Sequence, residues 1–359
     1  MWEVLICGFT GFSNFTKDIY DCDNTVKMMN KDVASKDMKY IKGRYYKEKN
    51  ICAGYRSDIN EEQLMTMNIY DNTYMIVYNG KIYNTKEIKE NLRKNNFSFE
   101  KNSDTEILLK GYIHYGTDIV KHINGAFSFA IWNSKKQELF LARDHFGVKP
   151  LYYSLFNDNL VFSSEIKTIL QFPNFEIKID NQGISELFGI GPAHTPGTCI
   201  FKDIYDLKPA HFLIYNKSGV YTDRYWKLES KPHTDDFNTT CNNVKNILEN
   251  SIKSQIISDL PLCSFLSGGL DSSIISLYAA EYYKENKRSK LNTFSVDYID
   301  NDKNFVKNDF QPNSDKHYID IITDLLKTNH QTICIDTPEL ADSLKDAMIA
   351  RAMPRNGRY

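Results

Sequence analysis

The stretch Phe265–Ser273, which reads FLSGGLDSS, decides the fold of the second half of the chain. It joins an apolar run, Leu262–Leu266, to a run with helical spacing, Asp271–Lys284. A second strand-like run follows at Thr293–Tyr298. Strand, loop, helix and strand in this order predict a βαβ unit, and therefore a parallel sheet with helices on its faces.

The residue types of this loop predict an anion site. Gly268 and Gly269 let the backbone turn tightly, so that successive N–H groups can point into one concavity. The helix start adds partial positive charge, and Ser272 and Ser273 add hydroxyl donors, which suits a pyrophosphate. Asp271 would repel a bare phosphate and is better explained as a magnesium ligand. The loop lacks the Gly-Lys-Ser/Thr ending of a Walker loop, and its composition alone equally allows a simple N-capped turn.

The first half of the chain reads as short strands separated by turns, with two helices at Thr85–Asn95 and Asp104–Tyr115. Asn79-Gly80 is expected to break the first of these strands. The pattern is α+β rather than alternating βαβ. The predicted strands are Tyr74–Tyr78, Ala126–Trp132, Leu139–Ala142, Leu160–Phe162 and His211–Tyr215.

Length and composition limit the class of protein. The 359 residues suit two domains, with a polar boundary near Gly219–Lys231 and a helix after it at Thr239–Ser258. The net charge of -2 gives no long-range attraction to nucleic acid or anionic membranes. The seven cysteines are dispersed without a CxxC pair, which argues against a disulfide framework or a zinc site. Without a signal peptide or a long apolar run, a soluble, cytoplasmic protein is expected.

Longer strings carry a resemblance to a known family. Phe265–Ala279, FLSGGLDSSIISLYA, closely resembles asparagine synthetases, and its loop resembles the pyrophosphate loop of the N-type ATP pyrophosphatases. The resemblance covers nearly everything from Cys7 to Arg351, so the chain is identified as a member of the glutamine-hydrolysing, class II amidotransferase group of asparagine synthetases. The other strings are CGFTGF (7–12), YNGKIYN (78–84), SDTE (103–106), GAFSFAIW (125–132), LFLARDHFGVKPLYY (139–153) and FSSEIK (162–167).

The resemblance implies a mixed α+β and α/β fold in two domains. Residues 1–220 would form an N-terminal-nucleophile (Ntn) hydrolase domain, an αββα sandwich with glutaminase activity. Residues 221–359 would form an incomplete α/β ATP pyrophosphatase domain, whose loop is called the PP-loop. The family often dimerises, so a homodimer is also expected.

The implied activity is a ligase reaction that makes asparagine. Aspartate would be adenylated with ATP and magnesium, and ammonia released from glutamine would displace AMP. Asp271 would hold the magnesium. By the same resemblance, the residues that contact ATP would be Leu266, Ser267, Gly268, Gly269, Asp271, Ser272, Ser273 and Val296.

The resemblance also assigns a glutaminase site. Cys7 would be the nucleophile, exposed as the first residue so that its own α-amino group serves as the base. The Asn79 side chain and the Gly80 N–H would form the oxyanion hole. Arg56 would bind the glutamine carboxylate and Asp104 its amino group, with Ile59 also in contact. Without the family, Cys7 reads as a small core residue, Asn79-Gly80 as a hairpin turn, Arg56 as a surface arginine and Asp104 as a helix cap.

Several departures keep other functions open. Residues Met1–Ile6 precede Cys7, so a free α-amino group requires translation from the Ile6 codon or proteolysis. Lys81 occupies a position where the family has Glu, and Ala34–Lys39 replaces the family's HRGPD segment. The chain also stops soon after Arg351, from which an exposed sheet edge and marginal stability are expected. The alternatives are a stand-alone glutaminase and an inactive amidotransferase-like binding protein.

Overall fold

The structure is a computed structural model that describes residues 7–19, 22–31, 42–57, 63–190, 194–256, 262–309 and 313–351. Ile59, the Ala34–Lys39 segment and the Met1–Ile6 leader therefore lie outside the described residues. The chain folds into two compact units, whose main spans are Leu5–Glu229 and Ser230–Asp346. Each unit is described by itself.

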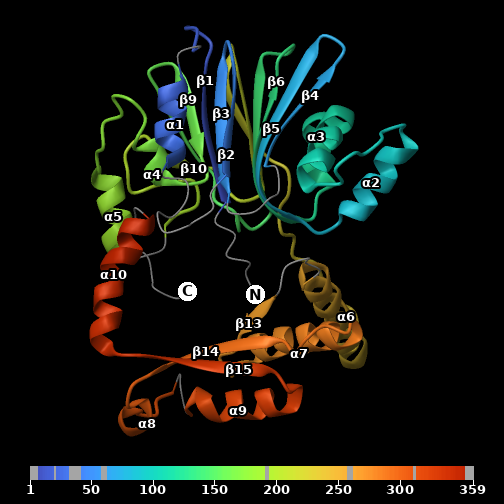
Figure 1. The fold of residues 1–359 in the computed structure, drawn as a ribbon, viewed down its shortest axis with the longest axis vertical. Coiled ribbons are helices and arrows are strands. Elements are labelled where there is room, and N and C mark those ends of the chain that lie inside the picture. Colours follow the sequence, from blue (N-terminus) through green and yellow to red (C-terminus); the bar gives the residue numbers. More distant parts are fainter. Residues whose placement is uncertain are drawn as a thin grey trace. The chain divides into compact units, whose positions relative to one another are not determined.

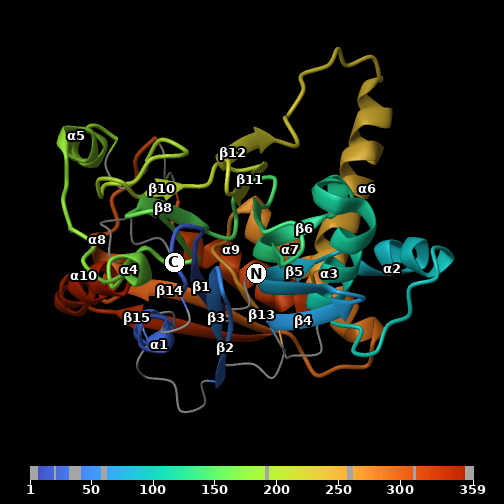
Figure 2. The same ribbon diagram turned by 90° about the horizontal axis from the view of Figure 1, so that it is seen from above.

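The first unit contains two six-stranded antiparallel sheets (Figures 1 and 2). One sheet has the order β10-β8-β9-β1-β3-β2, and the other has the order β12-β11-β7-β6-β5-β4. The first sheet is built from β1 (Cys7–Asn14), β2 (Lys42–Glu48), β3 (Ile51–Ser57), β8 (Tyr152–Phe156), β9 (Asn159–Ser163) and β10 (Tyr205–Asp206). The second sheet is built from β4 (Leu64–Ile69), β5 (Asn72–Ile82), β6 (Gly125–Asn133), β7 (Glu138–Arg143), β11 (His211–Asn216) and β12 (Gly219–Arg224).

Helices cover the outer face of each sheet (Figure 1). Helices α1 (Asp23–Lys31) and α4 (Ile166–Ile169) pack on the first sheet. Helices α2 (Thr85–Lys94) and α3 (Asp104–Tyr115) lie beside the second sheet, and α3 packs directly on β5. A further helix, α5, spans Asn181–Gly189. The layers are therefore α, β, β, α, which confirms the predicted sandwich.

Alternation along the strands divides the core of this unit into layers. In β6, Ala130 and Trp132 point between the sheets, where they meet Phe9 of β1 and Val77 of β5. Phe129 points the other way, into the cluster that includes residues of α2 and α3. Because both faces of β6 are covered, its sequence reads as a continuous apolar run rather than an alternating one.

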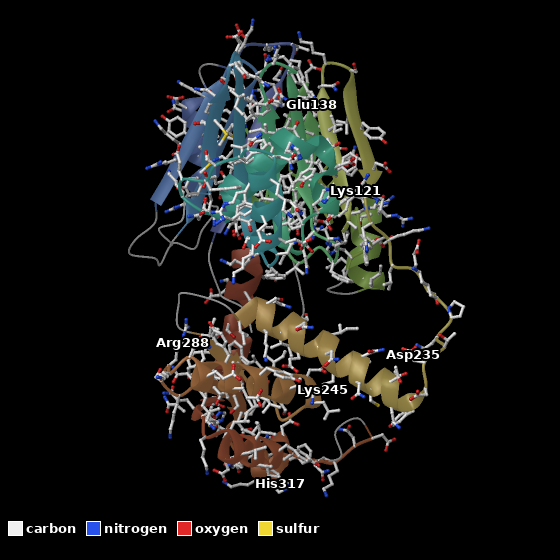
Figure 3. The ribbon with its side chains drawn as sticks, turned by 90° about the vertical axis from the view of Figure 1, so that its right-hand side faces the viewer. Lys121, Glu138, Asp235, Lys245, Arg288 and His317 are labelled. Carbon is white, nitrogen blue, oxygen red and sulfur yellow. The ribbon has the colours of Figure 1, made fainter. Side chains whose placement is uncertain are left out.

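The second unit has a three-stranded parallel sheet of order β13-β14-β15, which confirms the predicted βαβ pattern. Helix α7 packs against α9, and α6 packs against α7. Figure 3 shows α6 with Lys245 on its largely exposed surface. The elements are α6 (Phe237–Ile256), β13 (Cys263–Phe265), α7 (Leu270–Glu285), β14 (Asn292–Tyr298), α8 (Asn301–Asn304), α9 (Asp315–Leu326), β15 (Asn329–Ile335) and α10 (Thr337–Arg351).

Two features of the second sheet differ from the sequence predictions. Asn79-Gly80 does not break its strand, because β5 continues to Ile82 and pairs with β6 throughout. Strand β12 was not predicted, although it pairs with β11 from Gly219 to Arg224. Within the described part of the chain, no helix has both the length and the apolar character needed to cross a membrane.

Candidate functional site

The strands β1 and β3 bring two predicted glutaminase residues close in the first sheet. Cys7 is the first residue of β1, and its backbone pairs with Ser57 in antiparallel register. The next pair is Gly8 with Arg56, so Arg56 lies at the end of β3 nearest Cys7. Arg56 is half-buried. The side chain of Cys7 lies outside what the structure describes.

The two predicted oxyanion residues lie near the end of β5. Asn79 is 5% exposed and pairs with Ser128 of β6, while Gly80 pairs with Phe127. Gly80 has a φ of 154°, which L side chains rarely adopt. A Cβ at Gly80 would also lie 2.2 Å from the carbonyl oxygen of Ala126. Both facts require glycine here. Because Gly80 has no side chain, the backbone of β6 can approach it closely.

Asp104 ties helix α3 to this strand end. It is the first residue of α3, and its Oδ2 accepts hydrogen bonds from the Ile82 N–H at 2.8 Å and the Tyr78 hydroxyl at 3.2 Å. Burial raises the pKa of Asp104, whereas the charge of Lys81 and these two donors act in the opposite direction. The carboxylate therefore lies beside the strand that carries Asn79 and Gly80.

These residues form two neighbouring groups on facing sheets. Cys7 and Arg56 belong to β1 and β3, and Asn79, Gly80 and Asp104 belong to β5 and α3. Strand β1 packs against β5 across the space between the sheets. The predicted residues thus come from strands that face each other, which is the arrangement a single pocket between two sheets requires.

Asp144 was not among the residues predicted for the site. It anchors a loop beside the site through its carboxylate. Its carboxylate accepts backbone hydrogen bonds from Phe127 at 3.2 Å, Phe146 at 3.1 Å, Val148 at 2.9 Å and Lys149 at 2.9 Å. One of these donors is the residue paired with Gly80. The loop after β7 is therefore anchored to the part of β6 that supports Gly80.

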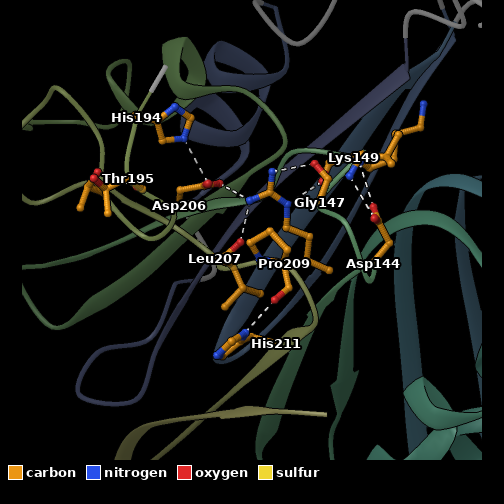
Figure 4. A network of polar contacts seen from close by, with 12 residues as sticks. Asp144, Gly147, Lys149, His194, Thr195, Asp206, Leu207, Pro209 and His211 are labelled. Atoms are coloured by element: carbon orange, nitrogen blue, oxygen red, sulfur yellow. Dashed lines mark hydrogen bonds and ion pairs between the residues drawn. The ribbon is translucent and has the colours of Figure 1, made fainter. Parts of the chain in front are cut away.

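Arg143, the preceding residue, contacts the same loop, and its partners Gly147, Asp206 and Leu207 are labelled in Figure 4. It is buried, donates to the carbonyl oxygens of Lys149, Gly147 and Leu207, and forms an ion pair with Asp206. The other oxygen of Asp206 lies 3.3 Å from His194 Nε2. The only signal in the sequence was the Arg-Asp pair that ends an apolar strand-like run, since buried charges need partners.

In the second unit, the predicted pyrophosphate loop joins β13 to α7. Gly268 has a φ of 77°, and a Cβ there would lie 2.8 Å from the carbonyl oxygen of Asp315. Ser267 and Ser272 place their hydroxyl oxygens 3.1 Å apart, and Ser273 donates to the Gly269 carbonyl oxygen at 2.7 Å. No side chain caps the start of α7 at Gly269.

This loop fits an anionic, phosphate-bearing ligand. Glycine at position 268 lets the loop turn tightly against the Asp315 backbone, and serine hydroxyls and the free helix start supply donors. Asp271 is exposed in the first turn of α7. No group of three acidic, histidine or cysteine residues is gathered for a metal within the described ranges. One carboxylate suits Mg²⁺ held mainly by the phosphates of a nucleotide.

The two remaining residues of the predicted ATP site flank the loop on neighbouring strands. Leu266 follows β13, is 1% exposed and donates its N–H to the Phe294 carbonyl oxygen of β14 at 2.8 Å. Val296 lies two residues further along β14 and is 49% exposed. All eight predicted residues therefore belong to the carboxyl end of this parallel sheet or to the helix start beside it, where open α/β sheets bind ligands.

Family models match both parts of the chain. The model described as a glutamine amidotransferase domain matches residues 6–226, and the model described as asparagine synthase matches residues 243–357. The first match alone covers more than half of the 359 residues.

Known proteins resemble the chain over much of its length. It is 39% identical to "Asparagine synthetase [glutamine-hydrolyzing] 3" of Bacillus subtilis over 97% of this chain and 57% of the relative. It is 32% identical to "Asparagine synthetase [glutamine-hydrolyzing] 1" of the same organism over 81% of this chain and 46% of the relative. The chain thus spans about half the length of these relatives.

Solved structures show a more distant similarity. A glutamine phosphoribosylpyrophosphate amidotransferase from B. subtilis, in complex with ADP and GMP, has a TM-score of 0.44 and 16% sequence identity. The match covers 79% of this chain and 64% of the solved one.

Proposed function

Because this chain belongs to the glutamine-hydrolysing asparagine synthetase family, we propose that it makes asparagine from aspartate, with ATP as the energy source and glutamine as the nitrogen donor. The family's substrates are glutamine, aspartate and ATP. For this chain the proposal extends to a glutaminase domain at 1–220 and an ATP pyrophosphatase domain at 221–359.

In the glutaminase half, the thiol of Cys7 passes its proton to its own α-amino group and attacks the amide carbon of glutamine. Ammonia leaves, and water hydrolyses the resulting thioester to glutamate. The Asn79 side chain and the Gly80 N–H stabilise the oxyanion, and Arg56, Asp104 and Ile59 bind the rest of glutamine. The Asp104 hydrogen bonds to Ile82 and Tyr78 support this proposal, since they fix a carboxylate next to the oxyanion strand.

In the other half, ATP would be held by Leu266, Ser267, Gly268, Gly269, Asp271, Ser272, Ser273 and Val296, and Asp271 would be a ligand of its magnesium ion. ATP supplies the adenylyl group that turns a carboxylate oxygen of aspartate into a leaving group. The chain's own contribution is to bind and orient the phosphates at Gly268, Gly269 and the start of α7. This open helix start, with serine hydroxyls around it, is the observation that carries the proposal.

The first experiment is the intact mass of the protein from its native host, followed by an assay with glutamine labelled with ¹⁵N in its amide. The whole proposal is supported if the intact mass shows that the mature chain begins at Cys7, and if the label is transferred to asparagine only when ATP, magnesium and aspartate are present. Glutamate release without ATP supports a stand-alone glutaminase. A mass that begins at Met1, with no glutamate released, contradicts the nucleophile at Cys7.

One observation favours an inactive binding protein as the second candidate. The positive charge of Lys81 acts on Asp104, the carboxylate that would bind the amino group of glutamine. A cation already close to that carboxylate weakens its attraction for the substrate ammonium group. This candidate binds glutamine or nucleotide without turnover, which equilibrium binding measurements distinguish from catalysis.

We further propose a homodimer in the cytoplasm, without nucleic-acid or membrane partners. The low net charge of -2 supports the absence of nucleic-acid binding. Light scattering at several protein concentrations tests the oligomeric state.

A further inference from the structure

A row of polar side chains crosses the second sheet where its apolar inter-sheet layer ends. Val77, Ala130 and Leu141 are paired across β5, β6 and β7, and all three belong to the core between the sheets. Two residues further along, the paired positions are Asn79, Ser128 and Arg143. Since side chains alternate with a period of two, this polar row faces the same way as the apolar one.

Ser128 is the middle residue of this row, and its hydroxyl has no hydrogen-bond partner in the part of the chain that the structure describes. The residue is 0% exposed, and its Oγ is a buried polar atom without a partner among the described residues. Such a group costs about 1–3 kcal/mol relative to a satisfied one. A buried polar atom that is kept unsatisfied calls for a functional explanation.

Of the two residues paired with Ser128 across the strands, Asn79 is the one whose side chain is not already hydrogen-bonded to other described residues. Arg143, on one side, directs its donors to Asp206, Leu207, Lys149 and Gly147. Asn79, on the other side, makes no side-chain hydrogen bond to the described residues, and is 5% exposed. Directly opposite residues of antiparallel strands have Cβ atoms about 4.5–5.5 Å apart, which a serine and an asparagine side chain can bridge.

We propose that Ser128 is a positioning residue for the oxyanion hole. When glutamine is bound, the Ser128 hydroxyl donates to Oδ1 of Asn79, so that Nδ2 of the same carboxamide is turned toward the oxyanion of the glutamine intermediate. Without this bond the carboxamide can present either end, and Oδ1 would repel the developing negative charge. Catalytic hydrogen bonds that are long in a free enzyme shorten when substrate binds. The inference rests on the glutaminase activity proposed above.

The test uses Ser128→Ala and Ser128→Thr in the form of the protein that releases glutamate. Ser128→Ala is expected to lower kcat for glutamine hydrolysis about tenfold or more, less than the ~10²–10³ that removal of an oxyanion donor costs. KM stays within about twofold, because the bond matters most in the transition state. Ser128→Thr retains a hydroxyl and keeps most of the activity.

A double-mutant cycle separates positioning from a structural role. If Ser128 acts through Asn79, then Ser128→Ala causes no further loss of kcat in the Asn79→Ala background. Equal losses in both backgrounds, or an unchanged kcat in the single variant, overturn the inference. The melting temperature of Ser128→Ala is expected to be unchanged or higher, since the substitution removes an unsatisfied buried hydroxyl.

Ser154 provides the matched control. It lies on β8 of the other sheet, is 0% exposed and also has a buried hydroxyl without a partner among the described residues. Ser154→Ala therefore makes the same chemical change at a site outside the polar row. It is expected to leave kcat and KM unchanged, and a loss equal to that of Ser128→Ala contradicts the inference.

A readout without turnover distinguishes failure of the inference from failure of the proposed function. In protein labelled with ¹⁵N-asparagine, the side-chain amide signal assigned through Asn79→Ala is expected to shift in Ser128→Ala when a glutamine analogue is bound. If that shift occurs in a protein without glutaminase activity, only the proposed function fails. If the signal does not depend on Ser128, the inference fails whatever the activity.

Discussion

At the scale of single residues, Gly80 combines a backbone conformation suited to glycine with a close approach to β6. Gly80→Ala would force a side chain into a φ of 154° and place its Cβ 2.2 Å from the Ala126 carbonyl oxygen. We expect the free energy of unfolding to fall by about 3 kcal/mol or more. Glutamine hydrolysis should be lost as well, because the N–H of residue 80 moves. Urea denaturation and glutamate release measure the two effects.

Gly116 offers a control for the conformational part of this loss. It has a φ of 62°, but a Cβ there would meet no atom within 4 Å. Gly116→Ala is therefore expected to cost about 1–3 kcal/mol, and to leave kcat unchanged. A cost at Gly80 no larger than at Gly116 would mean that the contact with Ala126 relaxes freely.

Lys81 gives a prediction about substrate affinity. Its charge acts on Asp104, which we propose binds the amino group of glutamine. Lys81→Glu should lower KM for glutamine about tenfold, because it replaces a repulsive charge near the ammonium group by an attractive one. Lys81→Met removes the positive charge without adding a negative one, so its KM for glutamine should lie between those of the wild type and Lys81→Glu. Steady-state kinetics at two salt concentrations test this, and an unchanged KM in Lys81→Glu would contradict it.

At the scale of elements, the start of α3 depends on one buried carboxylate. Glu106 accepts hydrogen bonds from the backbone N–H groups of Glu100, Lys101 and Asn102, and from Lys110 Nζ at 2.6 Å. Burial opposes its ionisation, but these donors together hold the pKa of Glu106 below its usual value. The polar turn before α3 is thereby fixed, and with it Asp104.

Glu106→Gln should destabilise the protein by about 2–3 kcal/mol at neutral pH, because a buried ion pair is broken. Since the folded pKa is depressed, the carboxylate's contribution is complete above its unfolded pKa of about 4.3 and is lost as the pH falls through the folded value. The difference between wild type and variant should therefore shrink below about pH 4. Urea denaturation between pH 3 and 7 would measure it, in steps of about one unit.

The matched control for this pH dependence is Glu90→Gln, on the exposed surface of α2. It should change stability by less than about 0.5 kcal/mol at any pH in that range. A constant difference between wild type and Glu106→Gln across the acid range would contradict the role of the ionised carboxylate.

Helices and strands that are marked by residues close together in the sequence were predictable. Strands that depend on pairing with a distant strand were not. Helix α3 begins at its predicted residue because Ser103 Oγ accepts the Glu106 N–H, a bond between residues three apart. Strand β5 continues through Asn79-Gly80 only because β6 pairs with it. All six residues of β12 are exposed, so no apolar period marks it. The position of Ser128 opposite Asn79 follows from strand register, which the chain sets by tertiary packing.

At the scale of the whole molecule, the two units differ in how much apolar core they bury. The first unit contains large clusters on both faces of its second sheet and a third beneath α1. The second unit, in its described residues, has a small cluster of Ile256, Leu262, Ala279, Tyr283 and Leu291. Its sheet also leaves Phe265, Val296 and Ile333 about half-exposed. Less burial means less stabilisation, so the two units should unfold separately.

We therefore expect two transitions in urea, the first confined to the second unit. Hydrogen exchange should show α7 and β14 losing protection before β6. If the loop at Gly268 binds nucleotide, MgATP at about 100 times its Kd should stabilise only the first transition, by about 2.7 kcal/mol. Gly268→Ala should abolish this shift, because its Cβ would lie 2.8 Å from the Asp315 carbonyl oxygen at a φ of 77°.

Gly219→Ala is the control, since Gly219 also has a positive φ, 109°, but lies in the first unit with open space around its Cβ position. It should leave the MgATP shift intact. A single transition would mean that the units stabilise each other, and an MgATP shift retained in Gly268→Ala would mean that the nucleotide binds elsewhere. Both results are distinct from the absence of any shift, which would contradict nucleotide binding by this chain.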